Sequence, residues 1–549
     1  MGFVGLLLAS ALVVEPQQIA YLVQSKEIPA AIDLYESYYK ARSTHDYDLL
    51  QRLGILLLEQ GVRSSDMETQ LLSLYGASIA GHQSSIDILE EGIKSPFFES
   101  QIAAVRFLAQ LQDDRCDRLL IKAMNSGYLP VRMEAGYQLA VRKHVKAVGQ
   151  IEALMYRIPE PYWAYFPQFF ALMGTNDAIS ILRHLMENPQ SHVRVQAIMN
   201  AARYGRDDLL PKIRAHATHA HVDEQEACAL ALGFLKDSKS IPQLKKLSNA
   251  PDSSVRLAAL QALHLLGDSE AAISISKLAE ENNLFAISLL SDIPSSTQLL
   301  AKLAQSKDTQ IKFNAAFALL KLRDGRCLRP LESFLIKDAH DTGYQPQVSP
   351  GTGFVSWKVV SSVQEQASHS FYDLLGITLH LREEIVARSV ELSESDFLHL
   401  SRLIFETRQF DLIPLVCSLL ENHRSPGAIA LLKEKAHTAG APLIRAYCNL
   451  SLLRLKEEGP YEDAVRKALS SMQTTELIQF RPDVPMDMRS AISPHQLTPE
   501  ESSRFLIEAY QTLADRHDEK GVEILLSALK AGNPKNRYVL AGLLAHALQ

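Results

Sequence analysis

The sequence lacks the short motifs of the common nucleotide-binding and hydrolytic enzymes. No GxGxxG, GxxxxGK[ST], HExxH or GxSxG pattern occurs in its 549 residues. Each of these patterns supplies a phosphate-binding loop, a pair of metal ligands or an activated nucleophile. Their absence argues against common nucleotide and hydrolase chemistry. We therefore predict that the chain is not an enzyme and has no catalytic residues, no cofactor and no metal.

Cysteine is scarce, and the spacing of the cysteines matches no disulfide or metal-binding motif. Five cysteines occur, none lies in a CxxC motif, and the number is odd, which excludes a disulfide framework or a zinc ribbon as the organising feature. Cys116 and Cys327 each follow an aspartate by three residues, so they occupy the same slot of two repeats. A free cysteine in such a slot is typical of a small buried packing residue.

A strong charge of one sign is also missing. Lys and Arg number 56 against 63 Asp and Glu, for a net charge of −7. Nucleic-acid binding rests on neutralising phosphates, so this balance predicts no nucleic-acid partner. A hydrophobic content of 47% with 22% charged residues is that of a folded chain.

Basic residues are absent from the first 25 positions, although Met1 to Val14 is apolar throughout. The run has the length of a secretory hydrophobic region and is too short to span a bilayer, but the basic flank of a signal peptide is missing. Two interpretations stay open. The chain is exported if this segment is a truncated signal peptide, and is otherwise cytoplasmic with a first solenoid helix here. Membrane association is expected only if the segment is an uncleaved anchor.

What the sequence does contain is a repeated phrase. It reads LPVRMEAGYQLA, SHVRVQAIMNAA, SSVRLAALQALH and TQIKFNAAFALL, with its basic residue at Arg132, Arg194, Arg256 and Lys312. These residues are 62, 62 and 56 positions apart, and weaker copies between them give a period of about 31. A period of 20 to 50 residues indicates a solenoid, whose units bury their apolar faces against their neighbours.

Each unit between about Asp66 and Lys337 is expected to form two helices. After the phrase at Ser253, apolar residues recur at helical spacing, and Gly267-Asp268 follows. Gly commonly ends a helix, and Asp accepts hydrogen bonds from the first amides of the next one. The small residues Ala258, Ala259 and Ala262 predict close approach between neighbouring helices.

The phrase, the Gly-Asp break and a proline in the second helix (Pro211, Pro242 and Pro330) resemble HEAT repeats, most closely the PBS-lyase HEAT-like type, over about residues 97–336. The resemblance implies an all-α, right-handed α-solenoid of HEAT-like two-helix repeats, here with two irregular insertions. It also implies two activities found among such proteins. Di-iron hydroxylases of this type use His-Glu dipeptides, and none occurs here. A bilin-lyase-like enzyme or chaperone handling a tetrapyrrole or its acceptor stays the alternative function.

The organisation along the chain follows from where this pattern weakens. We predict a signal-like lead-in at 1–27, a TPR-like helical cap at 28–65, the HEAT-like array at 66–337, an irregular Gly/Pro-rich insertion at 338–365, and degenerate helical repeats at 366–549 with a proline-rich loop near 480–499.

Two polar features have competing interpretations. His216, His219 and His221 form a weak metal site or simply a polar turn between helices, and we favour the turn because zinc sites need ligands fixed on rigid elements. The basic residues of the phrase form an anion-binding stripe or a structural ladder. We favour a ladder, in which each aspartate 12 or 13 residues later pairs with the next repeat's Arg.

Two irregular segments carry the candidate binding residues. The segment at 161–170 is rich in aromatic residues that cannot all face one core, which points to Trp163 and Tyr165 as partner contacts. The insertion at 338–365 contains Tyr344, Phe354 and Trp357, and strand-like residues follow Gly353. Insertions in solenoids often lie on the binding face. We predict a non-catalytic scaffold that binds a protein or peptide partner along the solenoid surface.

Overall fold

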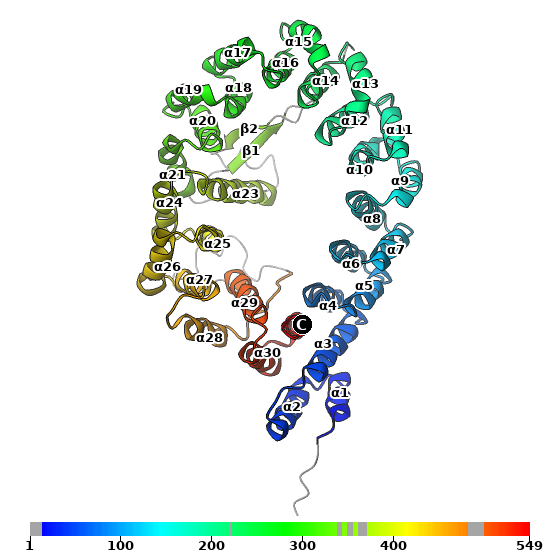
Figure 1. Cartoon of the computed structure of the whole chain (residues 1–549), viewed down its shortest axis with the longest axis vertical. Helices are drawn as coiled ribbons and strands as arrows, with labels where there is room; N and C mark the ends of the chain where they lie inside the picture. Colours follow the sequence, from blue (N-terminus) through cyan, green and yellow to red (C-terminus); the bar gives the residue numbers. More distant parts are fainter. Residues whose placement is uncertain (1–13, 219–220, 337–342, 349–354, 361–370, 481–498) are drawn as a thin grey trace, which may run out of the picture. The chain divides into compact units, whose positions relative to one another are not determined.

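A computed structural model describes residues 14–218, 221–336, 343–348, 355–360, 371–480 and 499–549 (Figure 1). The described chain is an all-α solenoid of antiparallel helices, as the repeats predict. The exception within those residues is one antiparallel hairpin, β1 (Gly343–Val348) and β2 (Val355–Val360), in the predicted insertion. None of the described helices is long and apolar enough to cross a membrane. The predictions for Met1 to Val13, Phe354 and 481–498 fall outside the described residues.

The chain forms two compact units. Unit 1 contains residues 1–139 and 459–549, and unit 2 contains residues 140–458. The domain boundaries predicted at 65, 337 and 365 stay predictions.

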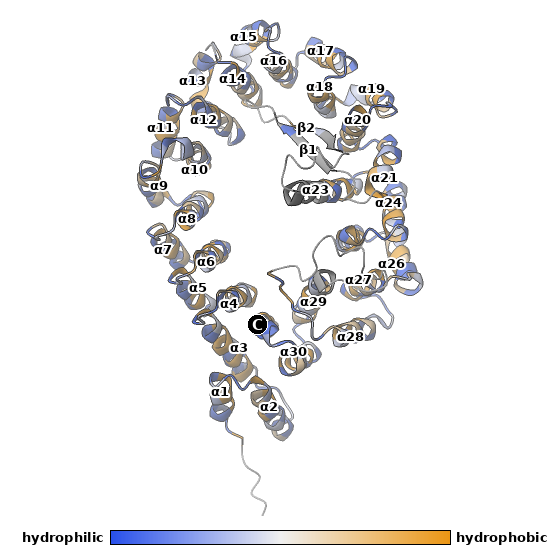
Figure 2. Cartoon of the chain, turned by 180° about the vertical axis from the view of Figure 1, so that it is seen from behind, coloured by the Kyte–Doolittle hydropathy of each residue, from blue (hydrophilic) through white to orange (hydrophobic). Residues whose placement is uncertain are grey.

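Unit 2 is built of two layers of helices. The first helices of successive repeats pack on one another in one layer, and the second helices form the other (Figure 1). The first helices are α10 (Phe166–Met173), α12 (Ser191–Arg203), α14 (Val222–Phe234), α16 (Ser253–Leu265), α18 (Leu284–Leu289), α20 (Thr309–Lys321), α23 (Phe371–Ser389), α25 (Ile413–His423) and α27 (Pro442–Arg454). The second helices are α9 (Val148–Met155), α11 (Asn176–Leu185), α13 (Leu210–His216), α15 (Ile241–Leu247), α17 (Ser269–Glu280), α19 (Thr297–Leu303), α21 (Leu328–Ile336), α24 (Glu394–Glu406) and α26 (Pro426–Thr438). Along these helices hydrophobic and hydrophilic residues alternate, as expected for amphipathic elements (Figure 2).

The Gly-Asp break ends the first helix as predicted. Gly267 has a φ of +91°, which a side chain would strain, and it follows the last turn of α16. The Asp268 carboxylate accepts hydrogen bonds from the amides of Glu270 and Ala271 and so caps α17. On α17, Ile273 is 66% exposed, so not every apolar residue of this helix belongs to the core.

The cysteines and small residues are buried as predicted. All five cysteines are free and buried, and Cys116 and Cys327 have no exposed surface. Burial raises the pKa of the Cys327 thiol to about 12, which keeps it protonated and unreactive. Ala258, Ala259 and Ala262 are also fully buried, and a Cβ added to Gly233 on α14 would lie 2.6 Å from the Ala262 Cα. The two helices therefore approach closely enough to require small residues.

The close packing of these helices predicts which of two substitutions in α16 lowers the stability more. Ala259→Leu is expected to lower the free energy of unfolding by about 1 to 3 kcal/mol, because the added atoms overpack a closed interface. Arg256→Ala, at a half-buried position, is expected to cost about 1 kcal/mol or less. Denaturant unfolding of the two variants checks the order, and a larger loss for Arg256→Ala would contradict the assignment of buried and exposed positions.

The predicted ladder between the phrase arginines and the later aspartates is wrong. Two phrase arginines instead donate to a carbonyl oxygen six residues earlier, Arg194 to Asn188 at 2.5 Å and Arg256 to Ala250 at 3.2 Å. Arg445, near the start of α27, makes the same contact with Ala439 at 2.6 Å. They therefore tie down the turn that precedes each first helix.

A basic residue 23 positions earlier pairs with the aspartate instead. Arg214 binds Asp237 at 2.7 Å and Lys245 binds Asp268 at 3.3 Å. The hydrogen bond from Arg214 lowers the pKa of the Asp237 carboxyl. The stacking of second helices, which the sequence period does not specify, decides these partners.

Unit 1 joins the two ends of the chain in one core. Its N-terminal helices are α1 (Pro16–Gln24), α2 (Ile28–Arg42), α3 (Tyr47–Val62), α4 (Met67–Ala80), α5 (Ser85–Ile93), α6 (Phe98–Gln110), α7 (Asp114–Ala123) and α8 (Leu129–Val141), the last of which ends in unit 2. Its C-terminal helices are α28 (Tyr461–Ser471), α29 (Pro499–Ala514), α30 (Glu519–Ala531) and α31 (Arg537–Ala547). Helix α31 packs on α3 and α4, and α30 packs on α2.

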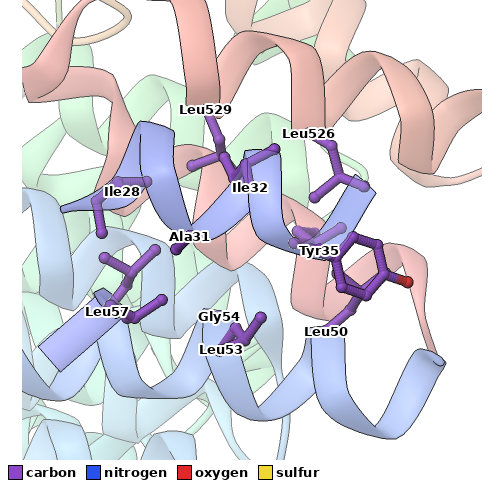
Figure 3. A pocket seen from close by; sticks show the side chains of 12 residues that line it. Ile28, Ala31, Ile32, Tyr35, Leu50, Leu53, Gly54, Leu57, Leu526 and Leu529 are labelled. Atoms are coloured by element: carbon purple, nitrogen blue, oxygen red, sulfur yellow. The ribbon is translucent and has the colours of Figure 1, made fainter. Parts of the chain in front are cut away.

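The contact between the chain ends is close and well paired. A Cβ added at Gly542 of α31 would lie 2.6 Å from the Gly76 Cα of α4, so the two backbones touch. Lys530 forms ion pairs with Asp33 at 2.6 Å and Glu36 at 3.1 Å. A cavity of about 30 Å³ remains between α2, α3 and α30, where Ile32 and Leu529 point toward one another (Figure 3). That volume is about one water molecule, so this region is core and not a ligand site.

Candidate protein-binding surface

The hairpin is attached to the first-helix layer of unit 2 through Asn314 of α20. The Trp357 amide donates to the Asn314 Oδ1 at 2.9 Å, and the Asn314 Nδ2 donates to the Trp357 carbonyl oxygen at 2.8 Å. Asn314 is only 2% exposed. Its side-chain amide thus pairs with the main chain of β2 as a neighbouring strand would.

The Trp357 ring completes the contact with α20. It meets the Phe317 ring edge to face, with centroids 6.5 Å apart. Next to it lies a pocket of about 210 Å³, which is lined by Ser288, Asn314, Phe317, Ala318, Lys321, Val355, Trp357 and Glu384.

Lys321 supplies the positive charge of this pocket. Its Nζ lies 5.0 Å from the centroid of the Phe317 ring, a cation–π contact. The surrounding protein desolvates the ammonium group and lowers its pKa, although part of the side chain reaches solvent. Glu384, which is paired with Arg388 at 2.9 Å, supplies the nearest negative charge in the pocket lining.

These contacts identify one face of the first helices. Asn314, Phe317 and Lys321 are spaced as i, i+3 and i+7 and so lie on the same side of α20. Aligning the repeated phrase places Ala258, Gln261 and Leu265 at these positions on α16, and Ala227, Leu230 and Phe234 on α14. We call this side of α12, α14, α16 and α20 the phrase face.

The phrase face of α14 and α16 exposes apolar side chains at one repeated position. Phe234 is 47% exposed and Leu265 is 38% exposed, and each lies nine residues after the phrase position held by Arg256 in α16. Arg203 of α12 and Lys321 of α20 hold the same position and are exposed. Sequence reasoning missed this row because its apolar members continue the helical stripe and look like core. Aligning the repeats column by column would have found it.

The aromatic segment divides as predicted between core and surface. Phe166 and Phe170 are fully buried, while Tyr165 is 61% exposed. Trp163 is half-buried, and its Nε1 donates to the Ile158 carbonyl oxygen at 3.1 Å. Tyr156 lies edge-on to the Trp163 ring with centroids 5.3 Å apart. Trp163 and Tyr165 therefore offer a rigid aromatic surface.

The predicted binding residues lie on two separate sets of elements. The hairpin contacts α18, α20 and α23, whereas the aromatic segment contacts α10 and α12. Tyr344 lies in β1 opposite Val359, and Phe354 falls outside the described residues. The role of all five residues in partner binding stays a prediction.

The histidine-rich turn has a buried member and an exposed one. His216 is 5% exposed, and its Nδ1 lies 3.5 Å from the Glu224 Oε2. His221 is exposed, and His219 falls outside the described residues. Glu224 is fully buried and forms an ion pair with Arg194. In the described part of the chain, no three His, Cys, Asp or Glu side chains come together in a way that could hold a metal ion.

The family assignment follows from a match in the middle of unit 2. Residues 210–287, which run from α13 into α18, match the family model for HEAT repeats. The chain contains HEAT repeats. The helices within residues 210–287 are HEAT repeats, and the phrase with Arg256 lies at the start of α16. No match is found among curated proteins.

Among solved structures, HEAT-like chains are similar to it only at low identity. The complex of CpcE and CpcF of phycocyanin lyase from Nostoc is 17% identical, over 51% of this chain and 92% of that one, with a TM-score of 0.24. Kap121p is 12% identical over 96% of this chain and 62% of that one, with a TM-score of 0.38. A homology model of the AP-3 complex is 11% identical over 96% and 98%, with a TM-score of 0.30. Resemblance at this level carries no information about function.

Proposed function

We propose that this HEAT-repeat protein is a non-catalytic scaffold that binds a protein or peptide partner along the phrase face of unit 2, with the hairpin as part of the contact surface. The observation that carries the proposal is the attachment of β2 to α20. Asn314 and Phe317 hold the main chain and ring of Trp357 on this face. The same face exposes Leu265 two first helices away and Phe234 three first helices away.

The chemistry of this surface favours binding over catalysis. Aromatic and aliphatic side chains on a rigid support are typical of binding hot spots, because they lose little conformational entropy when a partner covers them. The residues that line the pocket beside Trp357 include no histidine or cysteine. Exposed Tyr165 extends the apolar surface at the aromatic segment.

Replacing Tyr344 to Val360 by a short Gly-Ser linker tests the proposal. The helices are expected to keep their circular dichroism, because loop closure entropy changes only slowly with length. Capture of the partner from a lysate of the native cell, measured by quantitative mass spectrometry, is expected to fall at least tenfold. A second variant, Trp357→Ala, removes the ring and leaves the main-chain contact with Asn314 in place.

Two results would contradict the proposal. Unchanged capture by the linker variant would remove the hairpin from the contact surface and shift attention to Trp163 and Tyr165. A purified chain that carries a visible chromophore or a stoichiometric metal would favour an enzyme or chaperone over a scaffold.

A further inference from the structure

This inference rests on the proposed function and names the chemistry of the partner. We infer that the phrase face of α12, α14 and α16 binds an extended peptide segment. This segment has two apolar side chains three residues apart, and an acidic residue lies three residues before or after that pair. Phe234 and Leu265 contact the two apolar side chains, and Arg203 pairs with the acidic one.

The first argument is the repeated exposure of large apolar side chains. Phe234 and Leu265 come from neighbouring repeats, 31 residues apart, and hold the same position on packed helices. Both remain exposed by more than a third, whereas Leu230 and Leu263 on the same helices are almost fully buried. Exposed apolar residues that line up in adjacent repeats form a row, which scattered surface residues do not.

The second argument is the conformation of the segment already seated on this face. β2 is extended, and a buried side-chain amide binds both its main-chain N–H and its C=O at Trp357. A helical ligand could not make that contact, because its main-chain groups are already paired internally. Gln196 holds the position of Asn314 on α12 and is exposed, so an amide is available there too. Ala227 and Ala258 hold this position on α14 and α16 and are fully buried, so no main-chain contact is expected on these two helices.

The third argument fixes the spacing. Packed helices lie about 8 to 10 Å apart. A polyproline II segment rises about 3.1 Å per residue and presents every third side chain on one side, so residues i and i+3 are about 9 Å apart. A β-strand returns to the same side after two residues, or about 7 Å, which is too short. The row on α12, α14 and α16 therefore matches a three-residue repeat.

The fourth argument is the charge at the end of the row. Arg203 holds the position of Phe234 on the next helix, α12, and is exposed. No ion pair of Arg203 occurs among the described residues. A peptide carboxylate three residues from the apolar side chain that contacts Phe234 would reach Arg203. In an extended chain this carboxylate is free to rotate onto the guanidinium group.

A random 12-residue peptide library displayed on phage, selected against the full-length chain, tests the inference. We expect enrichment of peptides with apolar residues at i and i+3 and Asp or Glu three positions beyond one of them. The best peptide, labelled with fluorescein, is then measured by fluorescence anisotropy. Phe234→Ser with Leu265→Ser is expected to weaken its binding at least tenfold, and Arg203→Glu to reverse the preference for the acidic residue.

Ile273→Ser provides the matched control. Ile273 is 66% exposed but lies on α17 in the second-helix layer, so its replacement should leave peptide binding unchanged. Enrichment of helical peptides with apolar residues seven apart, enrichment of no pattern, or equal weakening by Ile273→Ser would each overturn the inference. If capture of the protein partner still depends on the hairpin in that case, the proposed function stands and only the peptide chemistry is wrong.

Discussion

Gly542→Ala is expected to destabilise unit 1 by at least about 3 kcal/mol, above the usual range for overpacking, because the new methyl group would collide with backbone. The Cβ would meet the Gly76 carbonyl group and Cα of α4, and neither can move unless the helices separate. Separation would also strain the contacts of Gly54 with Ala541 and of Gly61 with Tyr538, which join α31 to the neighbouring helix α3. The loss therefore extends over the whole junction of the chain ends.

Hydrogen exchange followed by mass spectrometry measures this effect locally, since a chain with two compact units need not unfold in one step. Peptides from α3, α4 and α31 are expected to lose protection, and peptides from α12 to α16 to keep it. Gly149→Ala is the control. Gly149 lies exposed in α9 with nothing within 4 Å of an added Cβ, so alanine should stabilise that helix slightly. Equal protection in the two variants would contradict the close approach of α4 and α31.

Arg194→Met is expected to cost about 3 to 5 kcal/mol, because it leaves a buried carboxylate without its main counter-charge. Glu224 has no exposed side-chain surface, and the Arg194 side chain is 11% exposed. Ser191 donates to the same carboxylate at 3.3 Å, and His216 lies 3.5 Å from its other oxygen, but neither side chain supplies the permanent charge of the guanidinium group.

The pH dependence of this loss has a definite sign. Without Arg194, the charged form of the buried Glu224 carboxylate is disfavoured in the folded variant. The destabilisation is then largest where Glu224 is ionised and shrinks as the pH falls and the carboxylate takes up a proton. Denaturant unfolding at several pH values measures it. The double variant Arg194→Met, Glu224→Leu should recover most of the stability, and a loss as large as that of the single variant would contradict the buried ion pair.

The features that the sequence determined are those encoded within one repeat. The end of α16 at Gly267, the cap at Asp268 and the burial of Cys116 and Cys327 all follow from patterns less than one repeat long, and the recurrence of such patterns gives the period of about 31 residues. Such patterns are readable because helix spacing, capping and packing of small residues depend on near neighbours. The strand-like residues after Gly353 likewise predicted β2.

Partners distant in sequence were decided by the tertiary structure alone. The contact of Gly76 with Gly542 joins positions that share no local pattern, and the Arg214–Asp237 pair depends on how second helices stack. Asn314 has the same appearance in the sequence as any polar helix residue until β2 lies against it. Phe234 and Leu265 fit the apolar stripe of a helix, and only the packed layer shows that their ends remain outside the core. The physical reason is that hydrophobic burial is not directional, so periodicity specifies which residues leave water but not which surface covers them.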